Sequence, residues 1–534
     1  MAQLSNRKGR AARTVTEERR RRSGLRVRPL ERFGLMEAMA EARSTQDSRL
    51  KRVQASGLGL LLIAILIGFL RYWKLGEWSL WHDEAITWAD AHHAVGTGQL
   101  YNPLGYVAIR WTVAFLGGIP TEFALRLLPA LCGHLAVLLT WWAFRPILGG
   151  RRAALAALLV AVSSWQIYWS QNARFYTMAE VLGLLGGGLV LRAYWSGSST
   201  RAVLGALCLA LGAWIQLSCA LLLGALIASP ILAKWVGAPI PEAGRRLSRR
   251  TWMVAIVLGL ASAPWAVGIW STYVDSKGSS GGLVARLSGA SHFLLTTGYF
   301  VTPLLGVGFL LGFVRAWLAR DAGAVLIALV AILGCAAGVA ASLGAVVSAQ
   351  YVFVLSPWIA AGAASLLPAD SWPSSAGGSA TAGTGRGPGW VLIALLVLPA
   401  AADSLLYFTQ RFGGRERWRE AWHYVWEEQR EGDLVAGMAA PVGEYYLAPG
   451  RTDLRHPRSV AWIDKHRAGL GDRWSSYPRR VWYVIRPDSL ATWEAADRDA
   501  FRARLQEECR IMRRFPVTME GRDLDVEVWL YEPQ

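Results

Sequence analysis

Long apolar runs recur along most of this chain, and each is long enough to cross a membrane. The first, residues 55–70, contains no charged residue and is followed by Tyr72 and Trp73, aromatic residues of the kind that favour the membrane–water interface. With 53% hydrophobic and only 18% charged residues, the 534-residue chain is not a string of soluble domains. We predict an all-α polytopic membrane protein with about eleven transmembrane helices. The other runs are 127–147, 153–169, 176–194, 202–217, 219–235, 252–270, 294–314, 323–343, 348–367 and 389–406.

The net charge of +18 is distributed unevenly along the chain. Residues 1–52 hold 15 basic against 6 acidic residues, residues 53–406 hold 20 against 11, and residues 407–534 hold 21 against 21. No globular part is strongly basic, which argues against a nucleic-acid partner. Residues 1–52 lack an apolar run, so we predict a disordered cytoplasmic arm that lies on the anionic inner leaflet.

Charged residues of the connecting segments are sorted between the two sides of the predicted membrane domain, residues 53–410. If the N-terminus is cytoplasmic, the inner connections carry 13 basic residues, whereas most acids of the membrane part lie in the outer segments. The positive-inside rule favours this orientation. An odd number of spans then places residues 411–534 outside. We predict a multi-pass protein of the cytoplasmic (inner) membrane with an extracytoplasmic C-terminal domain.

Two further segments differ in character from the spans. Residues 71–126 form a long first outer loop, and its stretch 103–118 is predicted to form helices along the outer interface. Residues 368–388 are rich in Pro, Gly, Ser and Thr and are predicted to be a flexible linker. The C-terminal region combines a helical pattern at 418–430 with strand patterns, of which 525–531 reads as a final edge strand. A small α/β domain is the simplest account of residues 411–534.

An acidic pair, Asp83 and Glu84, follows the first span by about a dozen residues in the sequence Ser-Leu-Trp-His-Asp-Glu-Ala. Adjacent side chains point in different directions, so one carboxylate can face a cavity while the other braces it. A partly desolvated carboxylate has a raised pKa, which suits a general base for a hydroxyl group. The alternative is that the pair is simply solvated in a loop. His82 either orients Asp83 or lies in the interface.

A lone arginine, Arg174, lies at the outer end of the third run in the sequence Ala-Arg-Phe-Tyr. Arginine between apolar segments either meets an anion or extends toward the interface, and its planar fork suits a pair of phosphate oxygens. Tyr176 adds a hydroxyl donor. Glu180 follows Tyr176 by four residues on the same helix face, and we interpret it as bracing Tyr176.

The ordered set of motifs is similar to that of the superfamily C membrane glycosyltransferases. It comprises the Asp83-Glu84 pair, Asn102-Pro103, the Ala-Leu-Arg-Leu-Leu-Pro segment at 124–129 and the Ala-Arg-Phe-Tyr segment at 173–176. The resemblance is to the bacterial branch related to protein mannosyltransferases, lipid A aminoarabinose transferase and lipopolysaccharide-core galacturonosyltransferases. It covers most of residues 55–410 and extends loosely to 417–419 and 445–447.

The resemblance implies transfer of a sugar from a polyprenyl-phosphate donor to a lipid, glycan or protein acceptor at the outer face of the membrane. It assigns Asp83 to the catalytic position as general base of an inverting reaction, with Glu84 as its companion. It places Arg174 at the donor phosphate with Tyr176 in support. Arg126 either joins the same polar lining or anchors the interface. A guanidinium beside the departing phosphate stabilises the transition state more than the ground state.

One position departs from the pattern of these enzymes. Many relatives carry an Arg-Tyr pair where this chain has Gln350 and Tyr351, so a second phosphate contact there lacks a charge. The basic residues of the outer segment 271–293 are candidates to replace it, or are solvated loop residues. These candidates are Lys277, Arg286 and His292.

Neither a cofactor nor a metal is assigned from the sequence. Some distant members of the superfamily use a divalent cation at the first-loop acids, which this sequence allows but does not support. His92 and His93 lack a third ligand at metal spacing, and the five cysteines form no zinc pattern. The alternative functions are a transporter or flippase of lipid-linked sugars and a non-catalytic binding protein. A transporter is less favoured, because the ionisable residues gather at the outer rim and no half-to-half symmetry is found.

Overall fold

The computed structural model describes residues 57–93, 103–242, 244, 247, 267–268, 271, 283–345, 347–368, 389–447, 460–463, 479–519 and 522–533. The predicted arm (residues 1–52), nearly all of the linker 368–388, most of the run 252–270 and Lys277 lie outside the described residues. Every other predicted apolar run is largely helical. The prediction of about eleven spans is tested only in part.

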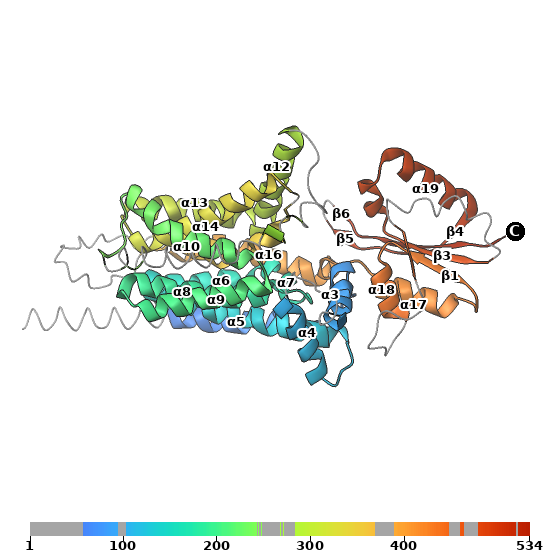
Figure 1. The fold of residues 1–534 in the computed structure, drawn as a ribbon, viewed down its shortest axis with the longest axis horizontal. Coiled ribbons are helices and arrows are strands. Elements are labelled where there is room, and N and C mark those ends of the chain that lie inside the picture. The colour runs from blue at the N-terminus through green and yellow to red at the C-terminus, as the bar shows by residue number, and fades with distance from the viewer. Residues whose placement is uncertain are drawn as a thin grey trace, which may run out of the picture. The chain divides into compact units, whose positions relative to one another are not determined.

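Helices make up nearly all of the described residues before the C-terminal region (Figure 1). A first helix, Gly57–Arg71, ends in the 3-10 turn η1 (Phe69–Arg71). Two helices occupy the outer loop, and the remainder follow the apolar runs. In order they are α3 (His82–His93), α4 (Pro103–Phe115), α5 (Glu122–Leu148), α6 (Gly150–Val162), α7 (Ser164–Ser170), α8 (Tyr176–Ser196), α9 (Ser199–Ile215), α10 (Ser218–Trp235), α12 (Leu283–Val301), α13 (Pro303–Leu318), α14 (Ala322–Ser342), η2 (Ala349–Leu355), α15 (Ser356–Ala364) and α16 (Gly389–Thr409).

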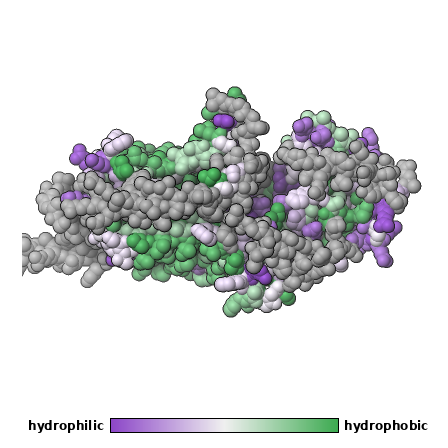
Figure 2. Space-filling view, viewed as in Figure 1, coloured by the Kyte–Doolittle hydropathy of each residue, from purple (hydrophilic) through white to green (hydrophobic). Residues whose placement is uncertain are grey.

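Several of these helices have the length and composition of membrane spans. Among the described residues four qualify individually, namely α5, α10, α14 and α16, and six qualify if each of two bent pairs counts as one span. Exposed leucine and other large apolar side chains cover α9 and α13, and Figure 2 shows hydrophobic residues over this part of the surface. Since such a surface is stable only against lipid, the chain is a multi-pass membrane protein.

Two runs predicted as single spans are broken in the structure. The run 153–169 bends by 62° between α6 and α7, where the Ser163 side chain caps α7 by accepting a hydrogen bond from the Gln166 backbone. The run 294–314 bends by 94° at Thr302. Thr302 precedes Pro303, whose ring disfavours a helical conformation at the preceding residue, and Thr302 adopts a φ of 68°. Hydropathy alone does not reveal either break.

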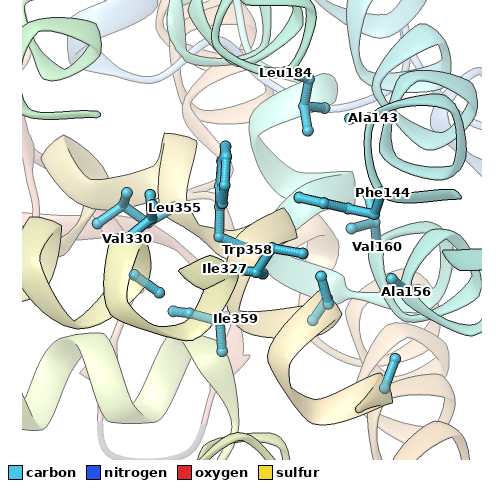
Figure 3. Packing of buried hydrophobic residues seen from close by; sticks show 14 of the residues in the cluster. Ala143, Phe144, Ala156, Val160, Leu184, Ile327, Val330, Leu355, Trp358 and Ile359 are labelled. Atoms are coloured by element: carbon cyan, nitrogen blue, oxygen red, sulfur yellow. The ribbon is translucent and has the colours of Figure 1, made fainter. Parts of the chain in front are cut away.

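The core of the helical part forms around Trp358 of α15, which is fully buried (Figure 3). Phe144 of α5 meets the Trp358 ring edge-on at 5.1 Å between centroids. Small residues then allow the helices to approach closely, as is usual where lipid replaces water. In α15 a run of alanines and Gly362 is buried, and the backbone of Gly362 lies directly against Gly312 of α13.

The C-terminal region is a small α/β structure with a five-stranded sheet in the order β2-β1-β3-β7-β4. Strand β3 pairs parallel with β1 and antiparallel with β7. The prediction that residues 525–531 form an edge strand is wrong, because β4, which carries three arginines and is mostly exposed, pairs with the far side of β7. The elements are η3 (Phe412–Gly414), α17 (Trp418–Glu428), β1 (Leu434–Gly437), α18 (Ala440–Leu447), β2 (Ala461–Trp462), β3 (Val481–Ile485), η5 (Pro487–Thr492), α19 (Ala495–Glu508), β4 (Cys509–Phe515), β5 (Thr518–Met519), β6 (Arg522–Asp523) and β7 (Val526–Tyr531).

Helices cover both faces of this sheet. Trp482 and Val484 pack with α17, whereas Tyr483 and Ile485 pack with Phe501 of α19, so alternate residues of β3 point to opposite apolar layers. Figure 1 shows α17 and α19 on opposite faces. This arrangement explains why all five residues of β3 are buried.

The close approach of α13 and α15 predicts a packing defect when Gly312 is enlarged. A Cβ at Gly312 would collide with the Gly362 carbonyl oxygen, whereas a Cβ at Gly306, on the same helix, meets nothing within 4 Å. We expect Gly312→Ala to lower the free energy of unfolding by about 1–3 kcal/mol. Gly306→Ala gains the same helix propensity and should be neutral or stabilising. Unfolding in detergent compares the two variants, and equal stability would contradict the packing.

Candidate functional site

The two acidic residues at the start of α3 have different environments. Glu84 is fully buried, whereas Asp83 is half-buried. Glu84 accepts hydrogen bonds from Nε and Nη2 of Arg126, both at 2.7 Å, and from the Ala173 backbone N–H at 2.7 Å. Among the described residues no hydrogen bond or salt bridge reaches the Asp83 carboxylate. Glu84 is therefore the bracing member of the pair, and Asp83 keeps its oxygens available.

The Glu84 carboxylate is the centre of a buried polar network. Arg126 also donates to the carbonyl oxygens of Trp78 (2.9 Å) and Ser79 (2.8 Å). A second buried guanidinium, that of Arg415 before α17, lies 3.6 Å from Glu84. Burial alone would raise the pKa of Glu84, but Arg126 and Arg415 hold it below its ordinary value. The network joins the outer loop, the start of α5 and the beginning of the C-terminal region.

Gln171 fixes the loop that carries Arg174. Its side-chain nitrogen donates to the carbonyl oxygens of Arg71 (3.2 Å) and Trp73 (2.6 Å). Its side-chain oxygen accepts hydrogen bonds from the Trp78 indole at 3.2 Å and the Tyr407 hydroxyl at 2.9 Å. Every polar atom of this buried amide is engaged, so the loop between α7 and α8 is held against the end of the first helix.

Arg174 lies next to Asp83 but forms no salt bridge with a described carboxylate. Its Nη1 donates to the Thr87 hydroxyl at 2.7 Å and to the Asp83 carbonyl oxygen at 3.4 Å. Its Nε is buried and has no partner among the described residues. Burial opposes its charge, but Tyr176 and Asp83 keep the pKa of Arg174 above its ordinary value. A half-buried cation with an unused donor is suited to binding an anion.

Tyrosines from three elements surround this guanidinium. Tyr106 of α4, Tyr176 of α8 and Tyr351 of η2 all interact electrostatically with Arg174. Burial raises the pKa of Tyr106 to about 12, and its hydroxyl donates to Asp90 at 3.3 Å. Tyr106 is therefore a neutral donor at physiological pH. Tyr176 and Tyr351, which the sequence offers as site candidates, both lie near Arg174.

His82 faces the C-terminal region. Its ring meets Trp462 of β2 at 5.2 Å and 67°, and its Nδ1 is buried without a partner in the described part of the chain. Burial lowers the pKa of His82, against the opposing effects of Asp83 and Glu416. A neutral imidazole therefore lies beside Asp83 at the junction with the C-terminal region.

The other candidates do not join this group. Arg126 is bound to Glu84 rather than lining the site. Gln350 is half-buried in η2, and Arg286 and His292 are exposed on α12. Glu180 does not brace Tyr176 through a hydrogen bond, since its carboxylate accepts from Gln166 of α7 and Ser356 of α15.

A divalent cation does not fit the first-loop acids in this arrangement. Both Glu84 oxygens are taken by Arg126, which repels a metal ion. In the described part of the chain no group of three or more His, Cys, Asp or Glu side chains could hold a metal ion.

Sequence reasoning missed Thr87, Gln171 and Arg415. Thr87 follows Asp83 by four residues, so helical spacing places both on one face, and this signal was available. Gln171 and Arg415 act through contacts with residues about 100 or more positions away, and no local pattern reveals them.

Comparisons with known proteins give structural matches only. No family model and no curated protein matches the chain. ArnT from Cupriavidus metallidurans, in a crystal structure bound to undecaprenyl phosphate, is 14% identical with a TM-score of 0.48, over 89% of this chain and 99% of that one. The oligosaccharyltransferase of Archaeoglobus fulgidus, tethered to an acceptor peptide, is 12% identical with a TM-score of 0.47, over 84% and 72%.

The Glu84 network predicts a large loss of stability in Glu84→Gln. The change leaves Arg126 and Arg415 buried without a counter-charge, so we expect a loss of about 3–5 kcal/mol. Glu77→Gln removes the same charge from an exposed residue, whose 3.8 Å pair with Lys74 is worth at most about 1 kcal/mol. Thermal or denaturant unfolding in detergent compares them.

The contribution of Glu84 to the free energy of unfolding should decrease as the pH falls. The lowered pKa of Glu84 means that its stabilisation is complete above the ordinary value of 4.5 and is lost as the pH falls through the lower folded-state value. Wild-type protein should therefore lose more stability on acidification than Glu84→Gln does. Parallel curves for the two proteins would argue against this role.

Proposed function

We propose that this protein transfers a sugar from a polyprenyl-phosphate donor to an acceptor at the outer face of the cytoplasmic membrane. The observation that carries the proposal is the pairing of an unengaged carboxylate, Asp83, with a half-buried arginine that has no carboxylate partner among the described residues, Arg174. One group can take a proton and the other can hold a phosphate. The sorting of basic residues to the inner connections supports the cytoplasmic N-terminus and the extracytoplasmic C-terminal region.

Asp83 is the proposed general base. Its carboxylate takes the proton of an acceptor hydroxyl as that oxygen forms a bond to the anomeric carbon of the sugar. Neighbouring His82 is neutral and does not quench the carboxylate as a fixed cation would. Because Glu84 satisfies the nearby arginines Arg126 and Arg415, Asp83 is left free for this task.

Arg174 is the proposed donor-phosphate ligand. As the new bond forms, the bond between the anomeric carbon and the phosphate oxygen breaks, and the polyprenyl phosphate departs with the electron pair. The guanidinium offers its unused Nε–H donor to this growing negative charge. The hydroxyl groups of Tyr176 and Tyr351 add further donors. A single displacement of this kind inverts the anomeric centre.

Glu84 acts in this proposal as a positioning residue. It contacts the Ala173 backbone, the residue before Arg174, and it is itself the residue after Asp83. The same buried carboxylate therefore constrains both reacting groups. Loss of Glu84 should reduce transfer through disorder of the site, whereas loss of Asp83 should leave the protein fully folded.

Replacement of Asp83 predicts loss of the chemical step. We expect Asp83→Asn to lower kcat by about 100-fold or more, because the amide cannot take the proton of the acceptor hydroxyl. New glycosidic bonds are measured by mass spectrometry with a panel of undecaprenyl-phosphate-linked sugars in nanodiscs. Asp499→Asn, on the exposed face of α19, serves as the control and should be fully active. Full transfer by Asp83→Asn would refute the proposed base, and sugar translocation without a new bond would indicate a flippase.

Replacement of Arg174 predicts weakened interaction with the phosphate. Lysine keeps the charge but loses the planar fork, and glutamine loses both. We expect Arg174→Lys to retain part of the activity and Arg174→Gln to weaken undecaprenyl-phosphate binding by about tenfold or more. Direct binding of undecaprenyl phosphate reports this separately from transfer. Unchanged affinity in Arg174→Gln would remove Arg174 from the phosphate site.

A further inference from the structure

A cavity lies outside the Asp83–Arg174 site. Its volume is about 340 Å³, within the range of small-molecule sites. Its walls come from three parts of the chain: the segment after the first helix, the end of α16 with the residues that follow it, and the loop after β4. The residues that matter below are Lys74, Glu77, Phe408, Phe412, Arg417 and Glu420.

The cavity lies where two membrane helices end on the same side. Lys74 follows the helix Gly57–Arg71 by three residues, and Phe408 is in the last turn of α16. The ring of Trp73, which is 48% exposed, lies 4.7 Å from that of Phe408. Leu405, one turn earlier on α16, is 61% exposed. A lipid-facing apolar surface therefore continues directly from the cavity wall, with Trp73 at the level where tryptophan meets lipid head groups.

The cavity is lined by two positive and two negative side chains, which form two separate ion pairs. Lys74 and Glu77 are 3.8 Å apart, and Arg417 and Glu420 are 3.2 Å apart. The two cations also lie over aromatic rings, Lys74 over Trp78 at 5.1 Å and Arg417 over Phe412 at 5.3 Å. Two positive and two negative groups around one polar cavity match a ligand that carries one charge of each sign.

The backbone holds Lys74 in an uncommon conformation. Its φ is 59°, in the left-handed region that a residue with a side chain rarely adopts. Its carbonyl oxygen accepts a hydrogen bond from the Glu77 N–H at 3.1 Å, which closes a turn. This turn places Lys74 and Glu77 together at the cavity, so both are directed by backbone structure rather than by side-chain flexibility alone.

We propose that this cavity binds the head group of a zwitterionic phospholipid, a phosphoethanolamine, from the outer leaflet. The phosphodiester lies against Lys74 and Arg417, and the ammonium group lies against Glu77 and Glu420. The acyl chains leave along Trp73 and Leu405. None of these residues belongs to the Asp83–Arg174 site, so the proposal is independent of the proposed sugar transfer.

The test measures lipid retained by the purified full-length protein. Protein is delipidated, incubated with vesicles containing equal amounts of phosphatidylethanolamine and phosphatidylglycerol, repurified and analysed by native mass spectrometry. We expect wild-type protein to retain phosphatidylethanolamine preferentially and the double variant Lys74→Gln/Arg417→Gln to retain about tenfold less. Arg286→Gln, which removes an exposed charge on α12, is the control and should behave as wild type.

A second variant guards against misfolding of the first. Thr409→Trp fills the cavity from the exposed end of α16 without changing any charge, and it should also abolish preferential retention. Equal retention by wild type and both variants would overturn the proposal. Preference for phosphatidylglycerol would also overturn it by showing an anionic site, as would displacement of the retained lipid by added undecaprenyl phosphate.

Discussion

The buried ion pair between Glu84 and Arg126 is the interaction on which the rest of the outer site depends. Both side chains are fully excluded from solvent, and the guanidinium binds the carboxylate in a bidentate manner. Burial of two charges is costly, and it is compensated only when geometry and further hydrogen bonds are complete. Here the backbone carbonyls of the outer loop complete the shell of Arg126, and the Ala173 N–H completes that of Glu84. The pair therefore fixes the outer loop and the Arg174 loop together.

The arginines near this pair differ in whether they have a carboxylate partner. Arginines with carboxylate partners, such as Arg126 with Glu84 and Arg419 with Glu122, are structural. Arg174 lies in the same polar layer, but its Nη1 donates to a hydroxyl and a carbonyl oxygen, and it has no carboxylate partner among the described residues. An anion site needs such a cation without a counter-charge, and this arrangement is stable only where the neighbouring charges are already paired.

Local sequence patterns predict the elements of this fold but not their contacts. The long apolar runs predict the helices. The short, continuous apolar run Val481–Ile485 predicts a strand that is buried on both faces. The pattern at 525–531 correctly predicts β7 but not its partner β4, whose charged residues conceal it as a strand. The bend at Thr302 is encoded by Pro303, a local signal that hydropathy averages out. The position of Pro303 thus indicates the break, whereas an average of hydropathy over the run does not.

The contacts of the candidate site are even harder to predict from the sequence. The sequence offers Asp83, Arg174 and Tyr176 as candidates, and the residues alone leave open which acid of the pair faces a cavity; only the resemblance assigns Asp83 to that position. The burial of Glu84 depends on Arg126 and on Arg415, the latter more than 300 positions away. Contacts of this separation leave no periodic trace in one sequence.

The C-terminal region is part of the site's support. The Tyr446 hydroxyl accepts from the Leu80 backbone N–H at 2.8 Å and donates to Glu122 at 2.9 Å, at the two ends of the outer loop. Trp462 meets His82, the residue before Asp83. Because these contacts hold the segment that leads into α3, displacement of the C-terminal region would move Asp83 relative to Arg174. The separation of Asp83 and Arg174 is thus governed from both the membrane helices and the C-terminal sheet.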